Sequence, residues 1–513
     1  MAEGKTYNGN YCEYDFEVTF LEKLVEAGWT YMSGKAMNSA AKDEVVYADD
    51  LLTFLKNTNP ELTIDEIGTI YDKVRLVGGS SEFTTLHNVY NWMVDGIQFM
   101  PNDGNAKIVQ LIDFEHPEEN IFRVVNQYSV EYINNGQRKT RRPDILLFVN
   151  GLPLCIFELK NPSDAKATIY DAWEQINIRY WRDIPQLLHY CPLACISDGV
   201  KTRLGTVRTP YEHFYAWRRV NDGDKVSTLP FDELETMVQG VYTPVRFLEI
   251  FRDYIYFQDS IYDKDEFEII CRYPQFFAAR LLKQSIIKSV QEKSGKGGTY
   301  FGATGCGKTY TMAFLARQLA QRCCDIPEIG SPTIVMIVDR EELQKQGAKL
   351  FTKSKEFLKI GEVAIVESRA HLRQELGARQ SGGFYICTIQ KFCERKDDPI
   401  GLINDRANII CFSDEAHRTQ LEHARTIQFS KDADANMKAM LSKPYAKVLR
   451  EAFPQATFVG FTGTPIAETY QTFGDEIDRY SMDQAVADGL TVAIKYHPRI
   501  SKVLLDDEKV KQI

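Results

Sequence analysis

Eight consecutive residues, 302–309, have the composition of a loop that binds phosphate groups. They read Gly-Ala-Thr-Gly-Cys-Gly-Lys-Thr. The residues expected to bind the nucleotide are Gly302, Thr304, Gly305, Cys306, Gly307, Lys308 and Thr309. Glycines let backbone N–H groups wrap around phosphate oxygens, the lysine reaches the terminal phosphates, and the threonine hydroxyl completes the coordination of Mg²⁺. The residues therefore predict a site for ATP and its magnesium ion.

A nucleotide site also needs a group that holds the metal and a base for the attacking water. Asp-Glu-Ala-His at 414–417 directly follows the apolar run 409–412. We expect Asp414 to hold Mg²⁺, directly or through water, and Glu415 to activate the hydrolytic water. A third run, 458–465, ends in Thr-Gly-Thr-Pro, which alone is ordinary turn chemistry.

A separate reactive group lies well upstream and consists of Asp144, Glu158 and Lys160. Cleavage of a phosphodiester needs carboxylates that hold a divalent cation at the scissile phosphate, together with a cation near the attacking water or the developing charge. These three residues provide that set and predict Mg²⁺ at Asp144 and Glu158. A simple ion pair between Glu158 and Lys160 is the alternative.

The elements that carry this group must bring its side chains to one face. On the expected strand 153–160, Glu158 and Lys160 are two residues apart and share a face. Asn150-Gly151 before it is a strong hairpin signal. A two-residue loop would turn Asp144 away from Glu158, so we expect an odd loop such as 149–151, with Gly151 left-handed in a bulge.

The second half of the chain alternates apolar runs with helical patterns. Residues 299–301 suggest a buried strand before the phosphate loop, and a helix with an apolar inner face should follow the loop. That inner face is formed by Met312, Leu315, Ala316 and Leu319. Alternating strands and helices predict a parallel sheet.

Taken in order, the phosphate loop, Asp-Glu-Ala-His and Thr-Gly-Thr-Pro resemble the first RecA-like lobe of superfamily 2 helicases and translocases. The segments 334–340 and 385–392 are similar to motifs Ia and Ib, which contact the nucleic-acid backbone in that superfamily. Tyr273-Pro274-Gln275 resembles the adenine-reading Q motif, in which Gln275 would bind the base. A surface glutamine is the commoner explanation of Gln275 alone.

Asp144 with Glu158-x-Lys160 resembles the PD-(D/E)xK nucleases. The longer stretch 141–161 closely resembles the motor (R) subunit of type I restriction enzymes, and further similarity covers nearly the whole chain. The resemblance implies a subunit that pumps double-stranded DNA with ATP and Mg²⁺, cuts it when translocation stalls, and assembles with modification (methyltransferase) and specificity subunits.

The same resemblance implies two further site residues. An acidic residue near the N-terminus joins the nuclease site in the family, and Glu17 is the candidate, although a charge on a helix surface explains it equally well. Gln175 matches the glutamine of a Gln-x3-Tyr motif, but Tyr180 follows it by five residues instead of four. On an α-helix this spacing would rotate Tyr180 off the face of Gln175, and a core aromatic residue is the commoner explanation of Tyr180.

These inferences define an α/β fold in which a PD-(D/E)xK nuclease domain precedes a RecA-like parallel-sheet lobe. We expect a nuclease domain over 1–225, a helical connector over 226–262, motor lobe 1 over 263–480, and at 481–513 the start of a connection to a second lobe. The residues after 491 are too few for that lobe, so we expect this chain alone to bind ATP weakly and not to translocate.

Composition excludes several classes of protein. The 513 residues are 44% hydrophobic and 26% charged, and no apolar run approaches the roughly 20 residues that span a bilayer, so we expect a cytoplasmic protein with no membrane partner. The 11 cysteines show no zinc-binding spacing and are expected to be reduced.

The formal net charge of −10 argues against indiscriminate coating of DNA and favours a channel shared with other subunits. Locally, Arg138-Lys139-Thr140-Arg141-Arg142 leads directly towards Asp144 and could meet phosphates, although a solvated loop is the alternative.

A second overall hypothesis remains: an ATP-gated nucleic-acid remodelling protein whose first domain is an inactive, nuclease-like binding module.

Overall fold

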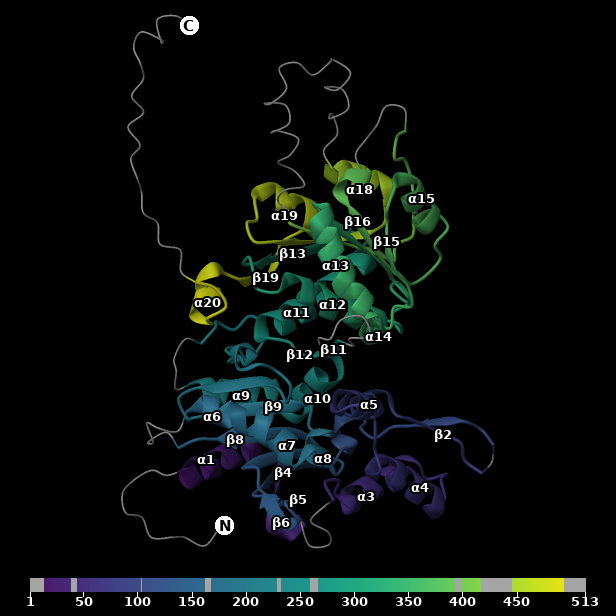
Figure 1. Ribbon diagram of the computed structural model, residues 1–513. Helices are drawn as coiled ribbons and strands as arrows, with labels where there is room; N and C mark the ends of the chain where they lie inside the picture. The colour runs from purple at the N-terminus through teal and green to yellow at the C-terminus, as the bar shows by residue number, and fades with distance from the viewer. Residues whose placement is uncertain are drawn as a thin grey trace, which may run out of the picture.

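The computed structural model describes residues 13–37, 44–102, 104–161, 168–227, 232–258, 266–392, 398–416 and 445–492. Two sheet-centred bodies are stacked along the long axis of the molecule (Figure 1), the first built from the N-terminal half of the chain and the second from the C-terminal half. The predicted α/β class is confirmed. His417 of the Asp-Glu-Ala-His run lies outside the described residues.

The first body surrounds a six-stranded mixed sheet with the order β1-β4-β7-β8-β9-β10. Its strands are β1 Thr30–Ser33, β4 Phe122–Asn126, β7 Ile145–Val149, β8 Leu152–Leu159, β9 Leu193–Ser197 and β10 Thr202–Thr206. The β1–β4 and β8–β9 pairs are parallel and the other pairs are antiparallel. Every residue of β7 and β8 is buried, so this hairpin runs through the core.

Helices pack around this sheet, and two separate hairpins lie outside it. The helices of the first body are α1 Glu13–Glu26, α2 Gly34–Met37, α3 Ala48–Thr58, α4 Ile64–Arg75, α5 Glu82–Asp95, η1 Pro117–Glu119, α6 Ile169–Glu174, η2 Gln175–Tyr180, α7 Trp181–Asp183, α8 Pro185–Leu188 and η3 Tyr211–His213. The separate hairpins are β2 Ile97–Phe99 with β3 Lys107–Val109, and β5 Val130–Asn134 with β6 Gln137–Arg141.

The turn between β7 and β8 differs from the prediction. Val149 pairs with Leu152, so the loop is only Asn150-Gly151, with left-handed φ angles of 51° and 78°. The predicted three-residue loop is wrong because Asn-Gly readily forms a tight two-residue turn of this kind. The Asn150 side chain is fully buried and bonds to the Ile121 N–H at 2.8 Å, which holds the turn in place.

A bulge further along β8 nevertheless returns the carboxylates to one face. Phe148 pairs with Pro153 and Leu147 pairs with Cys155, so Leu154 is an extra residue in the ladder. From there Ile145 pairs with Phe157, which places the preceding Asp144 opposite Glu158. The expected alignment of the two carboxylates is therefore present, but the bulge that produces it lies inside the strand and not in the turn.

The second body contains a seven-stranded parallel sheet with the order β15-β16-β14-β17-β18-β13-β19, as the alternating pattern predicted. Its strands are β13 Lys296–Gly302, β14 Thr333–Val338, β15 Val363–Ile365, β16 Phe384–Thr388, β17 Ile409–Asp414, β18 Thr457–Thr462 and β19 Glu476–Tyr480. Its helices are α11 Tyr273–Glu292, α12 Lys308–Arg322, α13 Glu341–Lys353, α14 Lys355–Leu358, α15 Arg369–Gly377, η5 Ile389–Phe392, α18 Tyr445–Ala452, α19 Ala467–Phe473 and α20 Met482–Ala487. The predicted inner face of α12 is buried.

A connector joins the two bodies and packs against both. It comprises α9 Glu233–Val241, α10 Pro244–Asp253 and β11 Ile255–Gln258, so the part predicted as a helical connector over 226–262 also contains a strand. This strand pairs with β12 Phe267–Ile270, which lies beyond residue 262. Asp253 at the end of α10 is 1% exposed and pairs with Arg322 of α12 at 2.7 Å. Burial opposes its ionisation, but the hydrogen bond from Arg322 and the charge of Arg317 lower the pKa of Asp253 to about 2. Removing either partner would leave an uncompensated buried charge, so this pair couples the connector to the motor lobe.

Two Asn-Gly turns of the same backbone geometry offer a matched test of the β7–β8 turn. A Cβ atom on Gly151 would lie 2.2 Å from the Tyr47 carbonyl oxygen, whereas nothing lies within 4 Å of such an atom on Gly136, whose φ is 76°. Gly151→Ala should lower the free energy of unfolding by about 2–3 kcal/mol more than Gly136→Ala, measured by denaturant unfolding. Equal losses would show that Tyr47 moves away without cost.

Candidate nuclease and nucleotide sites

Asp144 and Glu158 lie side by side at the end of the β7–β8 hairpin. The Asp144 carboxylate accepts a hydrogen bond from the Leu159 N–H at 2.7 Å, which fixes it to the neighbouring strand. The Glu158 side chain has no exposed surface, whereas Asp144 is partly exposed. The geometry therefore places one carboxylate below the surface and the other at its edge.

Three polar side chains surround Glu158. The Tyr180 hydroxyl donates to Glu158 Oε1, and the Gln175 amide donates to the Tyr180 oxygen at 2.8 Å. Lys160 Nζ donates to Gln175 Oε1 at 3.2 Å and lies 3.8 Å from Glu158 Oε2. The sequence-predicted Lys160 and Gln175 are thus both gathered at Glu158, and the proposed Glu158–Lys160 contact is present as part of a larger network.

The expectation that Tyr180 would turn away from Gln175 is wrong. Residues 175–180 form a turn of π-helix between α6 and α7. A π-helix closes i→i+5 hydrogen bonds, so side chains five residues apart lie one above the other. The extra residue in the Gln-to-Tyr spacing is absorbed by this turn. Only the odd spacing of five could have indicated it from sequence.

The electrostatics of Glu158 oppose its ionisation. Burial and the charge of Asp144 raise the pKa of Glu158 well above its usual value of 4.5, although Lys160 and Tyr180 act in the opposite direction. Burial and Glu158 also raise the pKa of Tyr180 well above 10, so its hydroxyl keeps the proton that it donates. A raised carboxylate pKa beside a second carboxylate is typical of a site that takes up a cation.

The residues fit a divalent metal ion. Glu158 Oε2 is buried without a hydrogen-bond partner, and Asp144 lies next to it. Within the described ranges no group of three or more His, Cys, Asp and Glu side chains is placed to hold a metal. Two carboxylates would therefore supply the protein's share of the ligands, and water or phosphate oxygens would supply the rest.

Glu17 lies in α1 and is buried, which excludes the alternative of a charge on the helix surface. Its carboxylate accepts hydrogen bonds from the Asn126 amide at 2.8 Å and the Gln127 amide at 2.7 Å. The backbone N–H of Gln127 in turn donates to the Asp144 carbonyl at 3.1 Å. Glu17 is thus linked to the backbone at Asp144 through one residue, and its membership of the nuclease site stays a prediction.

The phosphate loop connects β13 to α12, as predicted. Gly305 and Gly307 have φ angles of 81° and 86°, which only glycine adopts readily, while Thr304 and Gly305 are exposed. Thr309 lies in the first turn of α12 and is half-buried, and Cys306 is buried. Left-handed glycines next to a helix N-terminus form the kind of concave backbone that binds phosphate.

Asp414 and Glu415 end β17 beside this loop. Lys308 Nζ lies 3.7 Å from Glu415 Oε1, and Glu415 has a left-handed φ of 50° that turns it out of the strand. Burial, with a further contribution from Glu415, raises the pKa of Asp414 to about 6, although Lys308 opposes the shift. The third run also reaches the loop, because a Cβ atom on Gly463 would lie 3.3 Å from the Gly302 carbonyl oxygen.

Gln275 contacts the phosphate loop from the other side. The residue is 4% exposed, which excludes the alternative of a surface glutamine. Its Oε1 accepts a hydrogen bond from the Arg272 N–H at 2.9 Å, and its Nε2 lies 3.4 Å from the Gly307 carbonyl oxygen. Its role in reading adenine stays a prediction, because both ends of the amide face backbone groups here.

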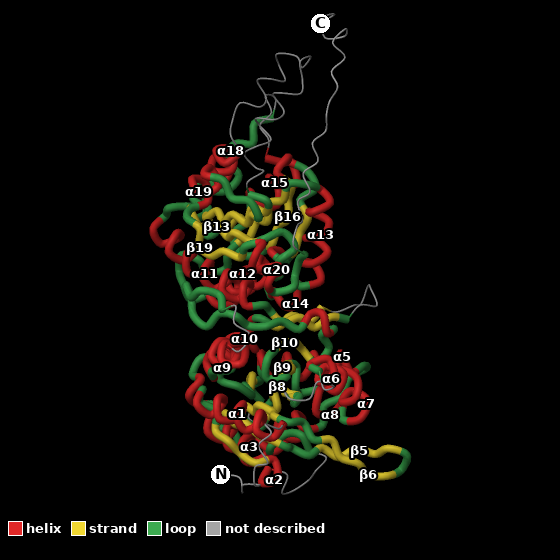
Figure 2. The backbone as a smooth tube through the Cα atoms, turned by 90° about the vertical axis from the view of Figure 1, so that its left-hand side faces the viewer, coloured by secondary structure: helices red, strands yellow, loops and turns green. Residues whose placement is uncertain are grey.

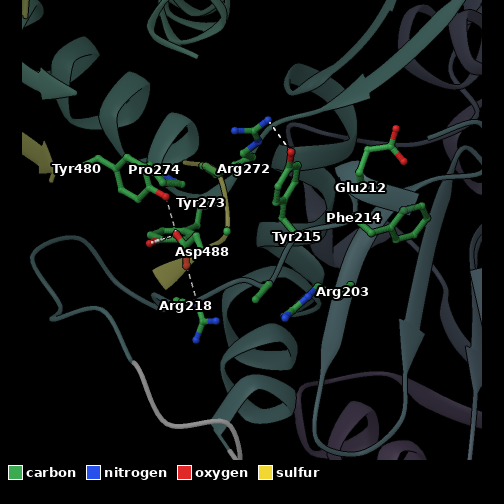
Figure 3. Close-up of a pocket in the computed structure, with 13 residues that line it drawn as sticks. Arg203, Glu212, Phe214, Tyr215, Arg218, Arg272, Tyr273, Pro274, Tyr480 and Asp488 are labelled. Carbon is green, nitrogen blue, oxygen red and sulfur yellow. Dashed lines mark hydrogen bonds and ion pairs between the residues drawn. The ribbon is translucent and has the colours of Figure 1, made fainter. Parts of the chain in front are cut away.

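A pocket opens at Pro274, between the two bodies (Figure 3). Arg272 and Tyr273 of the motor lobe line it, together with Tyr215 and Arg218 of the first body. Arg272 donates to the Tyr215 hydroxyl at 2.9 Å, and Arg218 pairs with Asp488 at 2.7 Å. Tyr480 also lines the pocket, and the β13–β19 pairing places it beside Gly302 of the phosphate loop. Aromatic and cationic side chains such as these are well suited to hold a planar base.

The raised pKa of Glu158 leads to a prediction on stability. Above pH 4.5 the unfolded chain has released the proton of Glu158, whereas the folded chain still keeps it. Between pH 4.5 and the raised pKa of the folded state, the free energy of unfolding should therefore fall by up to ~1.4 kcal/mol per pH unit. Glu158→Gln should remove this part of the decline, measured as melting temperatures from pH 5 to pH 8 in EDTA. Mg²⁺ should stabilise the wild type and not the variant.

The exposed Glu342 provides the control for the loss of a carboxylate, because Glu342→Gln should keep the decline of the melting temperature with pH that comes from the buried Glu158. Parallel profiles for the wild type and Glu158→Gln would contradict the raised pKa.

Among the described helices none is both long and apolar enough to cross a membrane. The nine described cysteines are all free, and only Cys324 is exposed, in agreement with the expectation of reduced, packed thiols.

Comparison with known families assigns each half of the chain. Residues 10–213 match the model of the type I restriction enzyme R protein N terminus, and residues 274–513 match that of the SWI2/SNF2 ATPase. The boundary between the two matches falls in the region of the connector.

Individual proteins are also similar to this chain. The HindI endonuclease subunit of a type I restriction enzyme from Haemophilus influenzae is 32% identical over 94% of this chain and 46% of its own length. A protein of Methanocaldococcus jannaschii, provisionally named the MjaIXP endonuclease subunit, is 30% identical over 97% of this chain and 47% of its own. A solved fragment of a type I restriction enzyme subunit from Vibrio vulnificus matches 72% of this chain and 56% of its own, at 16% identity and a TM-score of 0.25.

The chain spans about half the length of the curated relatives that it matches. With a part that matches the R protein N terminus followed by a part that matches the SWI2/SNF2 ATPase, it belongs to the family of type I restriction enzyme R, or endonuclease, subunits.

Proposed function

We propose that this chain supplies the nuclease and the first motor lobe of a restriction subunit that moves along double-stranded DNA with ATP and cuts it with the help of Mg²⁺. The observation that carries the nuclease half is the pairing of the buried Glu158 with Asp144 and Lys160 at one strand end. The domain limits at residues 225, 262 and 480 are part of the same proposal.

In the nuclease site Asp144 and Glu158 would hold Mg²⁺, which when bound supplies Lewis acidity at the scissile phosphate. Lys160 lies 3.8 Å from Glu158 Oε2 and can orient the attacking water or balance negative charge on the phosphate. Tyr180 and Gln175 position these two side chains through their hydrogen bonds. Glu17 holds Gln127 and, through it, the backbone at Asp144.

In the motor lobe the backbone of residues 302–307 would surround the phosphates, with Lys308 at the terminal phosphates. Thr309 and Asp414 would hold Mg²⁺, and a pKa of about 6 leaves Asp414 largely ionised at neutral pH. Glu415, turned out of β17 beside Lys308, would take the proton from the attacking water. The pocket lined by Tyr215, Arg272 and Tyr273 would accept the base.

The intact subunit would act in the cytoplasm together with modification and specificity subunits. The described residues contain one RecA-like sheet, and the chain spans about half the length of its relatives, so we assign translocation to the intact protein.

Asp144→Ala in the reconstituted complex should abolish DNA cutting and leave DNA-stimulated ATP hydrolysis unchanged, because the two sites lie in different bodies. Gel analysis of plasmid cleavage and a phosphate-release assay measure the two activities. The exposed Asp72 provides a control, since Asp72→Ala should change neither activity. Unchanged cutting by Asp144→Ala would refute the nuclease and favour an idle, nuclease-like binding module.

Glu415→Gln should reduce ATP hydrolysis roughly 10²–10⁴-fold, because the amide cannot accept the proton of the attacking water. Binding of a fluorescent ATP analogue should stay within about twofold, since the phosphate loop and Asp414 remain. Glu342→Gln serves here as the control of equal charge change on an exposed helix. Loss of nucleotide binding in Glu415→Gln would assign this residue to the binding of nucleotide or metal.

A further inference from the structure

The β5–β6 hairpin projects from the first body (Figure 2) and carries a local excess of positive charge. Residues 130–142 contain Arg138, Lys139, Arg141 and Arg142 against a single carboxylate, Glu131, in a chain whose net charge is −10. The basic stretch is thus mainly a strand, β6, and not the solvated loop considered from sequence.

Much of the hairpin faces solvent. Four of the five β6 residues are exposed, and the Arg138 side chain is 85% exposed. The apolar Ile133, directly opposite Arg138, is 76% exposed. Arg138 lies 3.6 Å from Glu131, but an ion pair this exposed is weak and screened by salt, so the guanidinium is available to another anion.

The base of the hairpin is fixed and lies at the nuclease site. Arg141 bonds to the buried Asp183 at 2.7 Å, and Gln186 donates to the Glu131 carbonyl at 3.1 Å. On one side, the chain leaves β4 through Gln127, whose N–H donates to the Asp144 carbonyl. On the other side, β6 ends only three residues before Asp144. A ribbon attached at the site therefore points away from it with a defined direction.

The dimensions and charge fit one kind of partner. Five residues per strand extend for about 17 Å, and the major groove of B-DNA, about 12 Å wide, admits a two-stranded β-ribbon. Arginine and lysine along such a ribbon would meet phosphates without reading sequence. A duplex held in this way would pass the nuclease site at the foot of the hairpin.

We propose that the β5–β6 hairpin is a guide for double-stranded DNA that holds the duplex beside the site of Asp144 and Glu158 at its foot. Arg138 and Lys139, which lie on opposite faces of β6, would contact the phosphate backbone. This inference rests on the proposed nuclease function and adds to it the surface that engages the substrate. Arg141 acts as a positioning residue through Asp183, and the exposed Arg138 and Lys139 make the contact.

The test is the affinity of the full 513-residue chain for a fluorescent DNA duplex, measured by anisotropy at several salt concentrations without divalent metal. Arg138→Ala/Lys139→Ala should weaken binding roughly tenfold and lower the slope of log affinity against log salt by about two. Arg138→Lys/Lys139→Arg, which keeps both charges, should have the affinity and the salt slope of the wild type. Lys56→Ala/Lys288→Ala removes two exposed charges elsewhere and should change neither.

Two alternatives give different results. If the charges only prevent the free edges of the hairpin from pairing with other chains, the double alanine variant will self-associate and bind DNA unchanged, which overturns the proposal. Absence of duplex binding by the wild type overturns it as well.

Failure of the guide and failure of the nuclease can be told apart. The guide fails if the double alanine variant binds and cuts as the wild type does while Asp144→Ala abolishes cutting. The nuclease fails if Asp144→Ala still cuts, whatever the DNA affinity of the hairpin variant.

Discussion

The first body is organised around a carboxylate that has been removed from water. Glu158 has no exposed surface and stands beside a second carboxylate, Asp144. Burying such a group is costly unless hydrogen bonds or opposite charge compensate it. Tyr180 and Lys160 provide part of the compensation, yet Oε2 is left without a hydrogen bond. A divalent cation at this position would complete it, which is why the arrangement supports a metal-dependent site.

Two single-residue irregularities make this arrangement possible. The bulge at Leu154 brings Asp144 opposite Glu158, and the π-turn of 175–180 brings Tyr180 over Gln175. Each interrupts a regular ladder of hydrogen bonds, and irregularities of both kinds occur often at functional sites. Both irregularities affect Glu158: the bulge lies in β8, the strand that carries Glu158, and the π-turn lies in the helical segment that contains Tyr180.

The second body depends on a different constraint, the direction of parallel strands. All seven strands run the same way, so the ends of β13, β17 and β18 place the phosphate loop, Asp414 and Gly463 at one edge. The first body lies against this lobe through charged pairs such as Arg219 with Asp478 at 2.8 Å. The pocket beside the phosphate loop is lined by residues of both bodies.

The sequence alone determined the fold class, the order of the two parts and which candidate residues come together. Apolar periodicity and motif spacing are local properties, and they predicted the parallel sheet, the phosphate loop and the grouping of Asp144, Glu158 and Lys160 correctly. The burial of Glu17 and the left-handed turn of Glu415 have no such local signal.

Register was decided by the tertiary structure. The loop between β7 and β8 was predicted one residue too long, and Tyr180 was predicted on the wrong face, because a bulge or a π-turn shifts all later side chains by one position. Whether a strand or helix accepts an extra residue depends on the packing around it. That packing involves residues distant in sequence, such as Tyr47 against Gly151, and becomes visible only when the chain is folded.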